Sequence, residues 1–432
     1  MLKLALSLGV FTSSALVVTS LVGSPHGTQD SIRPSAANAA DDTVEVRVAY
    51  PYGALFTDVH EQISEQFEQE NPGIDIILEA PLANYEELAQ RTLVGITQNN
   101  APTLSFQGIN QVRQFVDAGH TNDLSEFASS DPNWGEAGGY YPSMMELGEF
   151  NGRQHAIPFA VSTPIMYYNA DLFRAAGLDP ENPPTEWPDV IAAAQAIDAL
   201  GDDTEGLWYN YLITGNWNYQ ALVYSEGGSM MTEDESAVAF SGDPGVRAAQ
   251  LIRSFVDKAG MPDWSADQGE QSFVSGSVGI YFTSTSNLAL LQNGAQFELR
   301  TALFPLSSTG DRRLPTGGNA GIIITDDPAE AEAAYQYAMF AAGPVGNNIM
   351  VNNTGYMPMH SEAVTEEFYA ANPNYQTSIE QIPYIFRWYS FPGRNNLKII
   401  DEIKDSLQSI VSGQETPEAA IENAASSAED LL

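Results

Sequence analysis

The most informative features of this 432-residue sequence are the residues it lacks or has few of. It contains no cysteine, which excludes disulfides, thiol catalysis, iron–sulfur clusters and cysteine-based zinc sites. Basic residues are scarce: there are 17 Lys and Arg against 56 Asp and Glu, and the formal net charge is −39 at pH 7. A surface this acidic repels nucleic-acid phosphates and anionic lipids, so we expect no nucleic acid as a partner.

Long apolar runs are also missing beyond the N-terminus. No stretch after residue 23 approaches the ~18 uninterrupted apolar residues of a membrane-spanning helix. Hydrophobic residues nevertheless make up 43% of the chain, which at this length is enough for one large core or two moderate ones.

The first forty residues have the pattern of a secretory signal peptide. Lys3 precedes a charge-free apolar stretch over residues 4–23, and the small residues Ala37-Asn38-Ala39 follow. We therefore predict cleavage near Ala39 or Ala40 and export of the mature chain. The apolar stretch is also long enough to remain in a bilayer, so an uncleaved N-terminal anchor is the alternative.

The mature chain begins with alternating strand and helix patterns. Strands are expected at residues 44–50, 74–78 and 103–106. A helix with Thr57 as its cap follows the first strand, and residues 84–98 form the next helix. This β-α-β-α-β order predicts an α/β fold with a parallel sheet covered by helices. Further strands are expected at 156–159, 165–168, 278–282 and 322–325, and further helices at 185–200 (capped by Thr185), 328–342, 395–411 and 417–432.

Motifs for catalysis are scarce. The phosphate-binding G-x-x-x-x-G-K-[ST] loop, the dinucleotide fingerprint and the G-x-S-x-G elbow are all missing. His60-Glu61 begins a zinc-protease motif, but Ser64 stands where its second histidine would be. We therefore expect no metal site and no cofactor. Because 56 acidic residues are enough to supply a pair of catalytic carboxylates, a secreted glycosidase or lyase stays open as the alternative to a binding protein.

Aromatic residues are the strongest positive signal. Several fall where loops should leave strands, and such loops carry the ligand sites of α/β folds. Sugar and polyol rings pack their C–H faces on aromatic planes, while their hydroxyls need polar partners. The aromatic residues in such positions are Tyr50, Tyr52, Tyr85, Trp217, Tyr219, Tyr356, Trp388 and Tyr389.

Three parts of the sequence resemble one known family. The first comprises residues 158–180, with the string S-T-P-I-M-Y-Y-N-A-D-L-F, and residues 183–190. The second pairs Glu70-Asn-Pro-Gly with Asn100-Ala-Pro, and the third is Asn353-Thr-Gly-Tyr-Met-Pro. Together they resemble the extracellular solute-binding proteins of ABC carbohydrate importers, the family of maltose-binding protein. Within that family the glycerol-3-phosphate-binding branch is the most similar.

The resemblance implies a two-lobed periplasmic-binding-protein fold of type II, with a ligand cleft between the lobes. It implies that the lobes close around the ligand. It also implies that the protein is a monomer in the periplasm and is not an enzyme. Such a protein delivers a carbohydrate or polyol to an ABC permease in the inner membrane. A cell-surface adhesion or scaffold role is a further alternative. The implied lobes are residues 41–159 with 316–352 and residues 160–315 with 353–432, and the three hinge crossings lie near 158–161, 303–316 and 352–357.

The resemblance also implies a set of ligand contacts. The residues that correspond to cleft residues of the branch are the hydroxyls of Ser162 and Thr163, the stacking Trp217 and the cleft residue Tyr356. The loops at 284–286 and 317–319 correspond to loops that approach the ligand in the branch. The Arg that binds phosphate in the branch has no counterpart at the aligned position. Arg387 or Arg394 could replace it, since a guanidinium suits phosphate or several hydroxyls. The alternative is that both arginines form ion pairs on the surface. A neutral sugar or glycosyl-polyol is therefore favoured over glycerol 3-phosphate or its diesters, and a glycerol-phosphate-type ligand stays open. The predicted ligand-binding residues are Tyr50, Tyr52, Tyr85, Ser162, Thr163, Trp217, Ser284, Thr285, Gly318, Asn319, Tyr356, Arg387 and Arg394.

Overall fold

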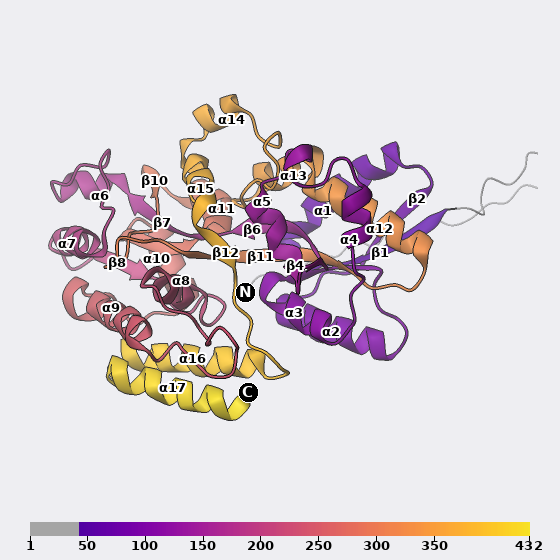
Figure 1. Cartoon of the computed structure of the whole chain (residues 1–432). Coiled ribbons are helices and arrows are strands. Elements are labelled where there is room, and N and C mark those ends of the chain that lie inside the picture. Colours follow the sequence, from indigo (N-terminus) through magenta and orange to yellow (C-terminus); the bar gives the residue numbers. More distant parts are fainter. Residues whose placement is uncertain (1–42) are drawn as a thin grey trace, which may run out of the picture. The chain divides into compact units, whose positions relative to one another are not determined.

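Two β-sheets organise residues 43–432, which are the residues that the computed structural model describes (Figure 1). The predicted signal peptide, the cleavage site and the alternative anchor lie outside these residues. Among residues 43–432, no helix is both long enough and apolar enough to cross a membrane.

The larger sheet has six strands and contains the β-α-β-α-β unit that the sequence predicts. Its strands are β1 (Val44–Ala49), β2 (Ile74–Leu78), β3 (Leu104–Gly108), β6 (Ile157–Ser162), β11 (Leu314–Ile323) and β12 (Ile385–Arg387). β1 pairs in parallel with β2 and β3, as predicted. β11 is antiparallel to both β3 and β6 and parallel to β12, so the complete sheet is mixed.

The smaller sheet has four strands in the order β10-β7-β9-β8. They are β7 (Pro164–Asn169), β8 (Glu205–Tyr209), β9 (Val278–Ser284) and β10 (Leu299–Ala302). β9 is parallel to β8 and antiparallel to β7. A separate hairpin joins β4 (Glu149–Phe150) to β5 (Arg153–Gln154).

Helices cover both sheets. In Figure 1, α1 and α2 lie on the right with β1 and β2, and α7 lies on the left with β8. Those in the first part of the chain are α1 (Gly53–Glu70), α2 (Tyr85–Thr97), α3 (Ile109–Asp117), α4 (Ser125–Ser130), α5 (Pro142–Met145), α6 (Ala170–Ala175), α7 (Trp187–Asp198) and α8 (Trp217–Ser225). The later ones are α9 (Asp243–Ala259), α10 (Ala266–Val274), α11 (Leu288–Gly294), α12 (Pro328–Ala342), α13 (Pro344–Asn353), α14 (Glu366–Ala371), α15 (Gln376–Glu380), α16 (Asn396–Val411) and α17 (Pro417–Leu431).

The starts of two helices differ from the sequence prediction. Thr57 does not cap α1, because the helix already begins at Gly53 with Tyr52 as its N-cap residue. Thr185 does not cap α7 either, since Glu186 precedes its first residue. The predicted inward face of α1 is correct: Val59, Ile63 and Phe67 are all buried. Helical periodicity therefore predicted the buried face of α1 correctly, whereas a candidate capping residue did not predict where either helix starts.

Each sheet has its own main hydrophobic core. Val48, Phe106 and Phe159 belong to the core of the six-stranded sheet, and Leu207 and Phe282 to that of the four-stranded sheet. The chain passes from one sheet to the other at Thr163, directly between β6 and β7, and returns between β10 and β11. Beyond α13 it contributes to both, because β12 pairs with β11 while α16 and α17 pack in the second core.

Candidate functional site

A cavity of about 270 Å³ collects residues from both sheets. Ser162 ends β6 of the six-stranded sheet, Ser284 ends β9 of the four-stranded sheet, and Gly317 and Gly318 lie in β11. The full lining is Tyr52, Leu55, Tyr85, Ser162, Ile213, Thr214, Trp217, Ser284, Ser286, Asn287, Gly317, Gly318, Tyr356 and Trp388. A site at strand ends of two separately packed sheets has the position expected of a ligand cleft.

Aromatic rings form much of the cavity wall. The rings of Tyr52 and Tyr85 meet edge to face, with their centroids 5.0 Å apart. The indoles of Trp217 and Trp388 also meet edge to face, at 6.4 Å. The ring of Tyr356, which lines the cavity, stacks on the ring of Phe56, which does not, with their centroids 5.6 Å apart. Because each ring is packed against another, the wall is held in place without a ligand.

Tyr52 reaches the cavity through an unusual backbone conformation. It lies in the left-handed region, at φ 53° and ψ 61°, immediately before α1. Its N–H donates to the carbonyl of Leu82 at 2.8 Å, which holds this conformation. Left-handed backbone at a bulky residue costs free energy and is concentrated at functional sites, so this strain is a second mark of the cavity as a ligand site.

Glycines bring the backbone of β11 directly to the cavity. Gly318 has φ 102°, and a Cβ atom there would lie 1.8 Å from the carbonyl oxygen of Ala160. A Cβ on Gly317 would lie 2.8 Å from Ser162 Oγ and 3.0 Å from the Trp217 ring. Both positions therefore require glycine, for conformation at Gly318 and for space at Gly317.

Polar groups in and beside the cavity are only partly satisfied by the protein. The Ser286 hydroxyl donates to Ser284 Oγ at 2.8 Å. The Nε1 atoms of Trp217 and Trp388 are buried and have no hydrogen-bond acceptor among residues 43–432. Asn319 Nδ2 donates to the Tyr85 hydroxyl at 3.3 Å, while its own Oδ1 is buried without a donor in the described chain. Unpaired buried polar atoms are costly, so these are groups that a hydroxyl-bearing ligand would satisfy.

No charged side chain is among the described residues that line the cavity. Its phenols are also neutral at physiological pH. Burial raises the pKa of Tyr356 to about 12, and burial also raises the pKa of Tyr52 and of Tyr85 above the usual value. The cavity therefore offers rings, hydroxyls, N–H groups and carbonyl oxygens, but no compensating charge for an ionic ligand.

Seven of the thirteen residues predicted from the sequence come together in this cavity. They are Tyr52, Tyr85, Ser162, Trp217, Ser284, Gly318 and Tyr356. Asn319 lies directly behind it through its hydrogen bond to Tyr85. Whether these residues bind ligand stays a prediction, which is taken up below.

The other predicted residues lie elsewhere. Tyr50 is buried in the first core, where its ring packs on His60 at 4.5 Å. Thr163 and Thr285 bond to each other instead of facing the cavity: the Thr163 N–H donates to Thr285 Oγ1 at 3.2 Å. Arg394 is exposed and is not among the cavity residues. Tyr50 follows a strand as predicted, but its side chain points to the core face.

Several lining residues were not predicted as ligand contacts. Leu55, Ile213, Thr214 and Asn287 carry no motif, and the fold alone brings them to the cavity. Ser286 and Gly317 fall inside stretches that the sequence analysis singled out. Trp388 was recognised as a loop aromatic, although the prediction favoured its neighbour Arg387.

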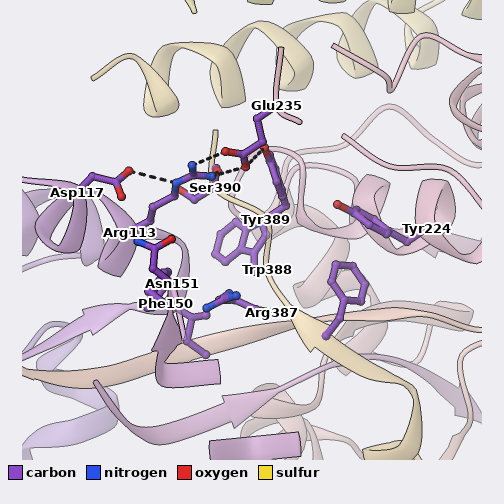
Figure 2. Close-up of a pocket in the computed structure, with 12 residues that line it drawn as sticks. Arg113, Asp117, Phe150, Asn151, Tyr224, Glu235, Arg387, Trp388, Tyr389 and Ser390 are labelled. Carbon is purple, nitrogen blue, oxygen red and sulfur yellow. Dashed lines mark hydrogen bonds and ion pairs between the residues drawn. The ribbon is translucent and has the colours of Figure 1, made fainter. Parts of the chain in front are cut away.

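Arg387 lies in a second cavity of about 430 Å³ (Figure 2). Its guanidinium stacks over the Phe150 ring, with the Cζ atom 4.3 Å from the ring centroid, and donates to the carbonyl of Glu149. Burial and the nearby Arg113 cation both lower the pKa of Arg387. It has no carboxylate partner among residues 43–432, so the surface ion pair considered from the sequence is not formed there.

No group of three or more His, Asp or Glu side chains in residues 43–432 is arranged to hold a metal ion.

The family is shown by comparison with known proteins. The family model described as "Bacterial extracellular solute-binding protein" matches residues 62–377. The chain therefore belongs to the bacterial extracellular solute-binding proteins, which bind ligands and are not enzymes. This confirms the resemblance inferred from the sequence and favours the binding protein over the glycosidase or lyase.

Individual relatives agree with the assignment. The chain is 23% identical to the sn-glycerol-3-phosphate-binding periplasmic protein UgpB of Escherichia coli (strain K12), over 86% of this chain and 89% of the relative. The crystal structure of UgpB from Mycobacterium tuberculosis in complex with glycerophosphocholine is similar with a TM-score of 0.78 at 20% identity, over 90% of this chain and 98% of that one.

A carbohydrate-binding structure is similar to a comparable degree. The cyclic alpha-maltosyl-1,6-maltose binding protein from Arthrobacter globiformis has a TM-score of 0.76 at 21% identity, over 90% of this chain and 98% of that one. At this identity the likeness shows the fold, and it confirms the predicted two-lobed, maltose-binding-protein-like α/β class.

Proposed function

We propose that this protein captures a small, neutral, hydroxyl-rich ligand, a sugar or glycosyl-polyol, in the 270 Å³ cavity. The observation that carries the proposal is the lining of the cavity: aromatic rings, hydroxyls and glycine backbone from both sheets, with no charged side chain among the described lining residues. At about 270 Å³ the cavity is slightly smaller than the ~300–1,000 Å³ typical of small-molecule sites, which favours a short ligand.

The chemistry of the wall matches a sugar. Tyr52, Trp217 and Tyr356 present ring faces or edges against which C–H groups pack. The unpaired Nε1 atoms of Trp217 and Trp388 are donors for ligand hydroxyls, and the serine hydroxyls both donate and accept. Binding would then remove the cost of leaving these buried donors unpaired.

A glycerophosphate-type ligand is the second candidate. It is favoured by the two UgpB relatives, one named for sn-glycerol 3-phosphate and the other solved with glycerophosphocholine. Phosphate in a buried site needs Arg, Lys or a dense set of N–H donors. Of the two predicted cations, Arg387 lines the other cavity and Arg394 lines neither of the two. The neutral ligand is therefore the better match to this chain.

Capture by closure of two lobes follows from the site's position. We assign the six-stranded sheet to the first lobe and the four-stranded sheet to the second, with Thr163 and residues 303–313 as two of the hinge segments. A third hinge follows α13, and β12 returns from the second lobe to the first sheet. A ligand that contacts both sheets stabilises the closed form. In this proposal the protein is an exported monomer, and its closed form docks on an ABC permease.

The test is a ligand screen by thermal shift, followed by calorimetry. The panel contains glucose, maltose, maltotriose, glucosylglycerol, glycerol 3-phosphate and glycerophosphocholine, each at low and high salt. A ligand at 100 times its Kd adds ~2.7 kcal/mol of stability, so a binder is easily detected. We expect a neutral member to bind with little salt dependence. Tight binding of glycerol 3-phosphate with no neutral binder would overturn the choice of ligand, and no binder of any kind would overturn the site.

A further inference from the structure

Trp388 contributes to two cavities. It lines the 270 Å³ cavity of the proposed ligand site and also the 430 Å³ cavity that contains Arg387. Among the described residues that line the two cavities, it is the single one they share. Trp388 is only 3% exposed, so the residue is almost completely buried where it contributes to both cavities.

The position of this indole is fixed by the backbone on both sides of it. Before it, Arg387 pairs with Thr316 in the β11–β12 register. After it, the side-chain amide of Gln220 holds Tyr389 at two points: the Tyr389 N–H donates to Gln220 Oε1 at 3.1 Å, and Gln220 Nε2 donates to the Tyr389 carbonyl at 3.2 Å. Gln220 belongs to α8, which also carries Trp217. The backbone next to Trp388 is therefore tied to the helix that carries Trp217, the neighbouring indole of the cavity wall.

The second cavity shares rings and uncharged polar groups with the first, but it also has four charged lining residues, Arg113, Asp117, Glu235 and Arg387. Phe150, Tyr224 and Phe386 supply rings, and Asn151 and Ser390 supply uncharged polar groups. In Figure 2, Trp388 is drawn between Arg387 below it and the Arg113–Glu235 ion pair above it. The Arg387 guanidinium uses one donor for the Glu149 carbonyl, which leaves further N–H groups for ligand hydroxyls.

We propose that Trp388 determines ligand length: it confines the ligand to the smaller cavity and blocks a subsite for one further sugar unit in the larger cavity behind it. This inference rests on the proposed function of the smaller cavity. Replacing the indole with a small side chain joins the two cavities into one aromatic-lined groove. The protein then accepts a ligand longer by one unit, because the added unit finds rings and donors that are already in place.

The experiment measures affinity along two oligosaccharide series by calorimetry. Glucose, maltose and maltotriose form one series, and glucose, cellobiose and cellotriose form the other. Wild-type protein is compared with Trp388→Ala, with the less disruptive Trp388→Leu, and with Trp388→Phe, which keeps a ring as partition. We expect the affinity for the trisaccharide relative to the disaccharide to rise at least tenfold in the Ala and Leu variants and by less than threefold in the Phe variant. Adding Arg387→Met to Trp388→Ala should reduce that gain.

Each outcome bears on the inference. Wild-type protein that already binds the trisaccharide as tightly as the disaccharide would overturn it, as would an unchanged ratio in a folded Leu variant. A crystal structure of the wild type with a trisaccharide unit in the larger cavity and Trp388 unmoved would do the same. If the wild type binds no member of either series, the proposed sugar ligand is wrong, and this inference is wrong with it. That result differs from one in which the wild type and the variants bind sugars with the same length preference, which overturns this inference alone.

Discussion

Arg113 and Glu235 form a two-pronged ion pair between parts of the chain that pack in different cores. Arg113 Nη1 lies 2.6 Å from Glu235 Oε1 and Nη2 lies 2.5 Å from Oε2, although 122 residues separate them. Arg113 is on α3, whose Val112 packs against β11, whereas Met230 near Glu235 packs in the core of the four-stranded sheet. The Tyr389 hydroxyl donates to Glu235 Oε1 at 2.8 Å (Figure 2). The pair therefore joins the two proposed lobes beside the second cavity.

The first prediction concerns this ion pair. Glu235→Gln should weaken ligand binding about fivefold, because the closed arrangement loses ~1 kcal/mol of charge-assisted hydrogen bonding. Calorimetry with the ligand found in the screen measures the change. Asp257→Asn is the matched control, since the Arg253–Asp257 pair has the same 2.5 Å distance but lies within α9 alone. Equal effects of the two substitutions would show that the Glu235 pair has no special role in closure.

The same pair predicts a dependence on acid. The Arg113 guanidinium lowers the pKa of the Glu235 carboxyl, with a smaller contribution from the Tyr389 hydroxyl. A carboxyl whose pKa is lowered in the ion-paired form stabilises that form above its unpaired pKa, and this contribution is lost as the pH falls through the paired value; we propose that the paired form is the closed, ligand-binding one. Affinity should therefore drop below about pH 4.5 in the wild type, and Glu235→Gln should remove that part of the drop.

Trp217 and Tyr356 should each contribute to binding more than to folding. A buried ring in a ligand site is worth about 0.5–1.5 kcal/mol beyond its buried area, so Trp217→Ala and Tyr356→Ala should each weaken binding tenfold or more. Calorimetry provides the affinity, and thermal melting provides the stability. Trp264→Ala is the control, because Trp264 packs on the second core and does not line the cavity. Variants that melt early yet bind like the wild type would identify both rings as core residues.

Gly318 should tolerate no side chain. Gly318→Ala places a methyl group at φ 102° and 1.8 Å from the Ala160 carbonyl oxygen, so we expect a loss of more than about 2 kcal/mol in the free energy of unfolding. Gly73→Ala is the control, since a Cβ there meets no heavy atom within 4 Å. Chemical denaturation measures both. A Gly318→Ala protein as stable as the control would contradict the close approach of β11 and β6.

His60 should make the fold sensitive to mild acid. The ring is fully buried among Tyr50, Phe106 and Phe159 and has no hydrogen-bond partner among residues 43–432. Burial lowers the pKa of His60 to about 3 from its usual 6.5. Between these two pKa values His60 is protonated in the unfolded chain but neutral in the folded chain. The free energy of unfolding therefore falls as the pH drops below 6.5, by ~3 kcal/mol at pH 4.5.

The measurement for His60 is denaturant unfolding at several pH values. His60→Phe should flatten the loss between pH 6.5 and 4.5, because a phenyl ring suits this aromatic surrounding and has no proton to gain. The partly exposed His120 provides the control variant, His120→Gln, which should keep the wild-type slope. A wild-type slope retained in His60→Phe would place the acid sensitivity elsewhere.

The sequence by itself determined the class of the protein and the start of the fold. Alternating patterns over residues 44–106 predicted the parallel β1–β3 unit, because local hydrophobic periodicity follows directly from burial on one face. The stretches around residues 158–190 and 353–358 led to the solute-binding family, which the family model confirms. Aromatic residues after strands predicted much of the cavity wall, since ligands of such folds meet strand ends.

Only the tertiary structure decided which of those residues face the cavity. Tyr50 and Tyr52 are two positions apart after the same strand, yet the first is a core residue and the second lines the cavity, because Tyr52 turns into the left-handed conformation. Thr163 sits beside Ser162 but is used in the passage between sheets, bonded to Thr285. The contribution of Trp388 to two cavities depends on contacts with β11 and α8 that are distant in sequence. Such long-range placement has no local signature, since it arises from the packing of whole elements.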